Sequence, residues 1–191
     1  MARRFIIPAL ILGALLFCRD VKCQSWRDLI STADSLSELD LADSAIKIGR
    51  LALVEAEREC GLEDTSVASV LHRLGVYTNT QYFTYGYDET ISWLERAQAI
   101  RERVYGKRHQ EVADVLSTLA IFYQKFHFYD KSDSLLKVAL DIYEETLGKE
   151  HPKTAQILWN LRYCQELWMI VLIVSSSSPV MQLPLFLHQR T

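Results

Sequence analysis

The sequence has few residues that break helices, with only 7 glycines and 4 prolines among its 191 residues. It also lacks an excess of basic residues, since the formal net charge is −3. Residues 1–23 hold four basic side chains and one acidic one, so the remainder carries 17 basic and 23 acidic residues, a net charge of −6. Without a basic stripe interleaved with aromatics, the chain does not have the composition of a nucleic-acid binder.

Motifs for catalysis and for cofactor or metal binding are also missing. The sequence has no Gly-rich phosphate loop and no Gly-x-Ser-x-Gly motif. Its four cysteines form no Cys-x-x-Cys pair and have no zinc-type spacing to histidine; they are Cys18, Cys23, Cys60 and Cys164. We therefore predict no enzyme activity, no cofactor and no metal. We interpret Cys60 and Cys164 as small apolar residues of the core.

The N-terminus has the pattern of an export signal. Arg3 and Arg4 precede an apolar run of 13 residues from Phe5 to Phe17, which is shorter than the roughly 20 residues of a membrane-spanning helix. We predict a signal peptide over residues 1–23 and a periplasmic or secreted protein. Two alternatives stay open: the run is retained as an N-terminal membrane anchor, or a cysteine (Cys18 or Cys23) is lipidated.

A repeat with a period of 42 residues occupies most of the remaining chain. Three features occur twice at this spacing, a Tyr-Asp pair, a glycine and a histidine, at Tyr87/Tyr129, Gly106/Gly148 and His109/His151. Each glycine follows an apolar pattern of helical spacing, and glycine just past a helix end often adopts positive φ. We interpret each histidine as a turn residue that bonds the backbone at the next helix start. A fixed period of this length indicates a repeat architecture.

The repeat divides the chain into paired helices. The first helix of each pair is expected at Trp26–Ser37, Val67–Thr78, Val112–Lys125 and Thr154–Leu167. The second helices are expected to begin near Asp43, Asp88 and Asp130 and to end before Gly61, Gly106 and Gly148. The middle unit is longer, because Gly61 and Gly106 are 45 residues apart, and we assign the extra residues to a lengthened turn at 78–86.

Small residues recur at three positions of these pairs, as tight packing of two helices requires. The equivalent sets are Ala45/Thr90/Ser132, Ala52/Ala97/Ala139 and Ala33/Gly75/Ala120. This pattern resembles the tetratricopeptide repeat, and the 42-residue spacing with Leu-Gly-Lys-Glu-His-Pro between helices resembles the kinesin-light-chain type. The resemblance implies an all-α solenoid, a right-handed superhelix of antiparallel helix pairs, with about three and a half repeats over residues 24–167.

The resemblance also implies a function. In tetratricopeptide arrays the first helices line a concave face that binds a protein or peptide, so we expect a non-catalytic interaction module. Transfer of the family's inward-facing positions predicts a partner-binding surface made of His72, Arg73, Asn79, Ser117, Thr118, Gln124, Lys125, Asn160 and Tyr163. Only Asn160 matches the family's ligand-pairing asparagine. The mixture of donors and apolar residues favours a short acidic or amphipathic segment as the ligand.

The last unit departs from the pattern. Arg162 occupies the small-residue position of Ala33, Gly75 and Ala120, and residues 168–191 are expected to form an irregular apolar tail. Three interpretations of this tail stay open: a flap over the last helix, a truncated or frame-shifted repeat, or a membrane-contacting segment. Two alternative functions follow, namely homo-oligomer assembly through the uncapped last helix, or a regulatory segment of a larger signalling or enzymatic protein.

Overall fold

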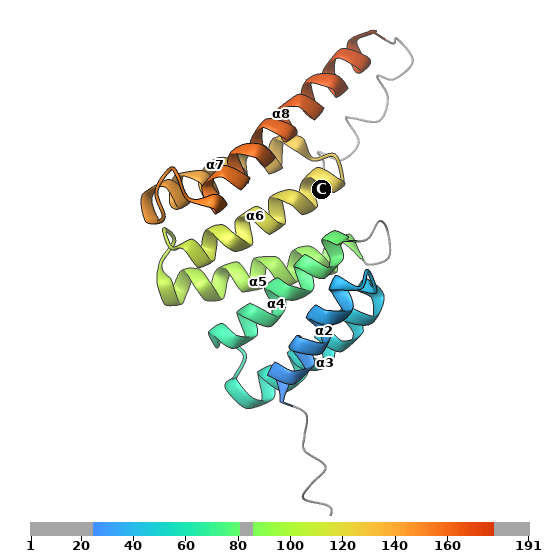
Figure 1. Cartoon of the computed structure of the whole chain (residues 1–191), viewed down its shortest axis with the longest axis vertical. Helices are drawn as coiled ribbons and strands as arrows, with labels where there is room; N and C mark the ends of the chain where they lie inside the picture. Colours follow the sequence, from blue (N-terminus) through green and yellow to red (C-terminus); the bar gives the residue numbers. More distant parts are fainter. Residues whose placement is uncertain (1–24, 81–85, 178–191) are drawn as a thin grey trace, which may run out of the picture.

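The computed structural model describes residues 25–80 and 86–177, which form helices stacked as antiparallel pairs (Figure 1). In chain order these helices are α2 (Trp26–Glu38), α3 (Ala42–Cys60), α4 (Thr65–Thr80), α5 (Tyr87–Tyr105), α6 (Gln110–Lys125), α7 (Tyr129–Thr146) and α8 (Pro152–Ser177). Helices α2 and α3, α4 and α5, and α6 and α7 pack as pairs, and each pair packs on the next. The described residues contain no strand, so the predicted all-α solenoid of three helix pairs and a further first helix is confirmed.

Glycine ends the helices at the predicted positions. Gly61, Gly106 and Gly148 have φ angles of 89°, 85° and 87°, in the left-handed region that residues with a Cβ avoid. At Gly106 the backbone N–H donates to the Glu102 carbonyl at 2.9 Å, which satisfies one of the last carbonyls of α5. The sharp turn that follows lets the chain reverse direction into the next first helix.

The two turn histidines cap the helices that follow them. His109 Nδ1 accepts a hydrogen bond from the Glu111 backbone N–H at 3.2 Å, and His151 Nδ1 accepts one from the Lys153 N–H at 3.1 Å. These bonds satisfy donors that have no partner within the helix. The predicted backbone-bonding role of both histidines is therefore confirmed.

Small residues allow close approach of the helices within each pair. Ala33 and Ala120 are fully buried, and at the equivalent Gly75 an added Cβ would lie only 2.4 Å from Cδ2 of Leu94. Gly49 has a related role between pairs, because a Cβ there would lie 2.7 Å from Cδ2 of Leu74 on α4. A larger side chain at Gly49 would therefore overlap Leu74 of the next pair.

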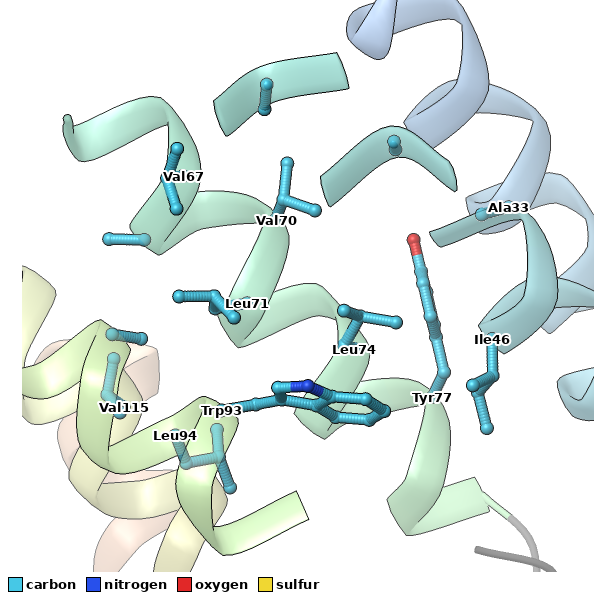
Figure 2. Packing of buried hydrophobic residues seen from close by; sticks show 14 of the residues in the cluster. Ala33, Ile46, Val67, Val70, Leu71, Leu74, Tyr77, Trp93, Leu94 and Val115 are labelled. Atoms are coloured by element: carbon cyan, nitrogen blue, oxygen red, sulfur yellow. The ribbon is translucent and has the colours of Figure 1, made fainter. Parts of the chain in front are cut away.

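The core consists of two clusters that meet at α6. One cluster runs from α2 to α6, and Figure 2 shows side chains that belong to it, among them Ile46 on α3, Leu74 on α4, Trp93 on α5 and Val115 on α6. The other cluster joins α6, α7 and α8. Cys164 is fully buried in this second cluster, as predicted, whereas Cys60 is exposed and the prediction that it packs as an apolar residue is wrong.

Two helix ends lie beyond their predicted positions. Helix α4 continues to Thr80, so residues 78–80 of the predicted turn are helical, and residues 81–85 lie outside the described part of the chain. Helix α8 continues to Ser177, ten residues past the expected boundary at Leu167. Residues 167–177 contain neither glycine nor proline, so nothing in this stretch stops the helix. The predicted signal (1–23) and the rest of the tail lie outside the described residues.

None of the helices in the described ranges combines the length and apolarity needed to cross a membrane.

Candidate functional site

A groove of about 580 Å³ lies along the first helices of three consecutive units. We name it the first-helix groove; it is lined by Asn79, Ile121, Gln124, Lys125, His127, Tyr129, Tyr163 and Leu167. The last turns of α4 and α6 provide the side chains of Asn79, Gln124 and Lys125, and the middle of α8 closes one side. Four predicted partner-binding residues meet here: Asn79, Gln124, Lys125 and Tyr163.

Side-chain amides of the groove tie successive first helices together. Asn79 Nδ2 donates to the Thr118 carbonyl at 3.2 Å, and Gln124 Nε2 donates to the Asn160 carbonyl at 3.2 Å. The second bond repeats the first one unit further along the solenoid. Lys125 Nζ donates to the Thr78 carbonyl at 2.8 Å, and burial lowers the pKa of Lys125. These side chains therefore hold the spacing between units as well as facing the groove.

One acceptor in the groove has no donor among the described residues. Asn79 Oδ1 is buried, and no described group donates a hydrogen bond to it. A buried carbonyl oxygen without a donor is unfavourable, so this atom favours an occupant that carries an N–H or O–H group. Asn160, the residue predicted to pair with a ligand, is itself only 7% exposed and is not part of the groove lining.

His72 and Thr118 belong to a buried polar network between the second and third units. His72 Nε2 lies 2.8 Å from Thr118 Oγ1, and His72 Nδ1 lies 3.3 Å from Arg101 Nη1. Because a guanidinium only donates, His72 Nδ1 is the acceptor, and Nε2–H donates to Thr118. Burial, with a smaller contribution from Arg101, lowers the pKa of His72 to about 4, although Asp114 acts in the opposite direction. His72 is therefore neutral at pH 7.

Arg101 anchors this network from the second helix of its pair. Its side chain is 5% exposed, forms an ion pair with the Glu111 carboxylate at 3.0 Å and donates to the Glu111 carbonyl at 2.8 Å. A buried guanidinium needs such partners, because unpaired burial of a charge is strongly unfavourable. The network is thus structural in its geometry, and it fixes helices α4, α5 and α6 relative to one another.

The remaining predicted residues lie apart from the groove. Arg73 Nη1 contacts Asp34 Oδ1 at 3.1 Å, which links α4 to α2. Ser117 Oγ donates to the Asp114 carbonyl of its own helix at 2.9 Å. The nine predicted residues therefore do not form one surface: some line the groove, some belong to the buried network, and others contact only residues of their own or a neighbouring helix. Their role in partner binding stays a prediction.

Sequence reasoning missed part of the groove lining. Ile121 and Leu167 belong to first helices, which were expected to face the ligand, whereas His127 lies in the turn after α6 and Tyr129 is the first residue of α7. His127 has a φ of 64°, and its Nδ1 lies 2.8 Å from the Tyr129 hydroxyl. A histidine at positive φ leaves no simple sequence signal, so these two residues could not be assigned in advance. Among the described residues, no three His, Cys, Asp or Glu side chains gather as they would to hold a metal ion.

Stacked helix pairs with small residues at the contacts and a groove along the first helices define an α-solenoid of helix-pair repeats. Residues 111–165 match a family model of the tetratricopeptide repeat. A comparison with curated proteins found no match.

Solved structures share the fold. BtubC (BKLC) from P. vanneervenii has a TM-score of 0.65 and 18% identity; the match covers 83% of this chain and 64% of that one. A Podosopora anserina protein assigned as a kinesin light chain, with nearly identical TPR-like repeats, has a TM-score of 0.63 and 18% identity over 80% of this chain and 75% of its own. A single-residue variant of it gives a TM-score of 0.63 at 17% identity, over 80% and 76%.

Residues 111–165 therefore match the tetratricopeptide repeat, and the described helices have the fold of kinesin-light-chain-like repeat structures, as the 42-residue spacing predicted. At identities below one in five, the likeness to the solved structures concerns the fold. Proteins of this fold generally mediate protein–protein interaction.

Proposed function

We propose that the protein is a non-catalytic interaction module that binds an acidic, amphipathic segment of a partner protein in the first-helix groove. The observation that carries this proposal is the composition of the groove lining. It contains the cation Lys125, the buried acceptor Asn79 Oδ1 and the apolar side chains of Ile121 and Leu167. The described residues of the lining include no carboxylate, although acidic residues outnumber basic ones in the chain as a whole.

The charge of the groove favours an acidic ligand. Burial lowers the pKa of Lys125, which means that its charged form is less stable there than in water. A carboxylate of the ligand within hydrogen-bonding distance would compensate for that lost hydration. Charge-assisted hydrogen bonds of this kind are about twice as strong as neutral ones.

The acceptor and the apolar residues favour a polypeptide as the source of that carboxylate. A backbone N–H of an extended segment is a suitable donor for Asn79 Oδ1, and neighbouring apolar side chains would lie on Ile121 and Leu167. The fold supports the same conclusion, since tetratricopeptide repeats are typically non-catalytic scaffolds. The proposal extends to location: the protein would act after export, as the pattern of residues 1–23 predicts.

A displayed library of random peptides, selected on the purified protein, tests the proposal. We expect enriched peptides to combine acidic and apolar residues and to bind less tightly as salt rises. Lys125→Met should weaken such a peptide about tenfold or more, since a charged hydrogen bond contributes about 1.5–3 kcal/mol, and Lys125→Glu should weaken it further.

The matched control is Lys137→Glu on α7, where an exposed lysine pairs with Asp133 away from the groove. It should leave peptide affinity unchanged. Circular dichroism should show that all three variants keep their helix content. Peptides that bind equally well to Lys125→Glu, or enrichment of basic peptides, would contradict the proposed site.

A further inference from the structure

The outer face of α8 is exposed and largely apolar. Helix α8 buries Thr154, Ile157 and Cys164 against its neighbours. On the opposite side, Trp159 is 64% exposed and Met169 is 58% exposed. In the second unit the position equivalent to Arg162 is Gly75, which packs on Leu94 of the second helix that follows, but no described second helix follows α8 to cover this position.

Arg162 makes this face unsuitable for an ordinary second helix of the solenoid. Its position is equivalent to Ala33, Gly75 and Ala120, where the partner helix lies so close that a Cβ at Gly75 would clash with Leu94. A long charged side chain cannot occupy that contact. The occupant of the face must therefore leave more room there, and a negative group opposite Arg162 would compensate for the hydration that its charge loses.

The exposed residues follow the spacing of a coiled-coil seam. Trp159, Arg162, Glu166 and Met169 are separated by three, four and three residues, which keeps them on one stripe of the helix. Arg162 Nε and Glu166 Oε1 lie 2.9 Å apart in the middle of this stripe, and both side chains are more than half exposed.

Open hollows of about 310 and 440 Å³ lie beside the Arg162–Glu166 pair. The first is lined by Trp159, Arg162, Tyr163 and Glu166, and the second includes Gln165, Met169 and Ile170. Side chains of a partner helix could enter hollows of this kind, as knobs enter holes in a coiled coil.

We propose that the occupant of this face is α8 of a second copy, packed antiparallel about a two-fold axis at the level of residue 164. In this register Arg162 of each copy meets Glu166 of the other, and Trp159 meets Met169. Both contacts follow from one register. In an antiparallel pair each residue faces the residue that is equally far from the axis in the other direction, and Arg162 and Glu166 are each two residues from position 164, while Trp159 and Met169 are each five. A parallel arrangement would instead place Arg162 on Arg162 and Glu166 on Glu166, which is unfavourable.

The arrangement exchanges the Arg162–Glu166 ion pair within each helix, two in total, for two ion pairs between the helices. The existing Arg162–Glu166 pair is exposed to water and therefore contributes little. Pairing of two copies would bury part of it beside Trp159 and Met169, where it contributes to the choice of partner and orientation. Since one helix face from each copy is a small interface, we expect a dimer that dissociates on dilution.

Sedimentation and light scattering of the full chain test the proposal, with charge reversals as the perturbation. The wild-type mass should rise from monomer to dimer with concentration and stop there. Arg162→Glu and Glu166→Arg should each place like charges across the axis and weaken the dimer at least tenfold. The double variant, Arg162→Glu with Glu166→Arg, should dimerise like the wild type because the two charges are exchanged.

The most discriminating measurement mixes the two single variants, Arg162→Glu and Glu166→Arg. One copy then carries two acidic residues on the stripe and the other two basic ones, so heterodimers should form where neither variant self-associates. Lys137→Glu, which breaks a comparable pair within α7, should dimerise like the wild type.

Three results would overturn the proposal. A wild-type monomer at every concentration means that another segment or partner covers the face, and a mass that grows past the dimer means head-to-tail association. Single variants that dimerise normally mean that a different surface is responsible. Since residues 162 and 166 are exposed, each variant should keep its helix content by circular dichroism, which separates loss of pairing from loss of folding.

Discussion

Acidification should destabilise the protein through His72. Burial lowers the pKa of this histidine to about 4 in the folded chain, whereas the usual value in an unfolded chain is 6.5. Between these values the unfolded chain binds a proton that the folded chain excludes. Stability from this group is therefore fully present above pH 6.5 and is lost as the pH falls toward 4. The difference in pKa corresponds to about 3 kcal/mol.

The contacts of His72 explain the direction. Nδ1 accepts from the buried guanidinium of Arg101, and Nε2–H donates to Thr118 Oγ1. A protonated ring would carry a hydrogen on Nδ1 that points at Arg101, so the bond would be lost and two positive charges would meet. Asp114 offsets part of this repulsion, and Arg73 adds to it, but burial has the largest effect.

The assay is urea denaturation of the wild type and of His72→Gln at several pH values between 4 and 7. Carboxylates that titrate in this range contribute to both proteins, so their effect cancels in the difference between the two free energies of unfolding. We expect that difference, wild type minus variant, to become about 3 kcal/mol less favourable to the wild type on going from pH 7 to pH 4. A difference that does not change with pH, or one that changes in the opposite direction, would refute the neutral, buried state of His72.

Three further substitutions test the packing and the network. Gly75→Ala should lower the free energy of unfolding by about 1–3 kcal/mol because its methyl group would lie 2.4 Å from Leu94 Cδ2. The double variant with Leu94→Ala should lose less than the sum of the two single losses. Additive losses would mean that the two residues do not touch. Gly106→Ala should be destabilised by about 1–2 kcal/mol because φ is 85°. Gly86→Ala, at φ −58° and with only an ordinary contact to Glu89 Cβ at 3.9 Å, should show little change in urea denaturation, and equal losses would contradict the role of φ. Arg101→Met should destabilise the fold by about 1–3 kcal/mol and raise the pKa of His72 in an NMR titration, while an unchanged pKa would show that the guanidinium does not face the ring.

The helix pairs were predictable because local chemistry and repeat spacing agree. Gly106 and Gly148 end helices at positive φ, and His109 and His151 cap the helices that follow. Each of these features depends on residues within a few positions in the sequence. Their recurrence at 42 residues then placed whole units in register, although only part of the chain matches the family closely.

The site was less predictable because its polar contacts do not recur from unit to unit. Ala56, Arg101 and Tyr143 occupy the same position on successive second helices, and all three are buried. Arg101 bonds His72 and Glu111, whereas the Tyr143 hydroxyl donates to Asp114, and Ala56 has no polar group. One position thus has three different chemistries, and a repeat pattern can predict its burial but not its bonds.

The length of α8 could not be predicted from the repeat either. The expectation of an irregular tail after Leu167 followed from the loss of the 42-residue repeat pattern. A helix can continue without that pattern, because it requires only residues that are compatible with helical backbone angles. Met169 to Ile173 lie on a continuous helix and remain exposed, so burial against the described helices does not account for their apolar character.

The two proposed surfaces meet at one side chain, and this determines which substitutions can separate them. Tyr163 lines the first-helix groove and also the hollow beside Arg162, and its ring stacks on Trp159 at a centroid distance of 5.4 Å. A Tyr163→Ala variant would therefore alter both surfaces at once and distinguish nothing. Lys125 lines only the groove, and Glu166 lies only on the outer face of α8. If dimerisation changes peptide affinity through Tyr163, then by thermodynamic linkage the peptide shifts the dimer equilibrium of the wild type by the same factor.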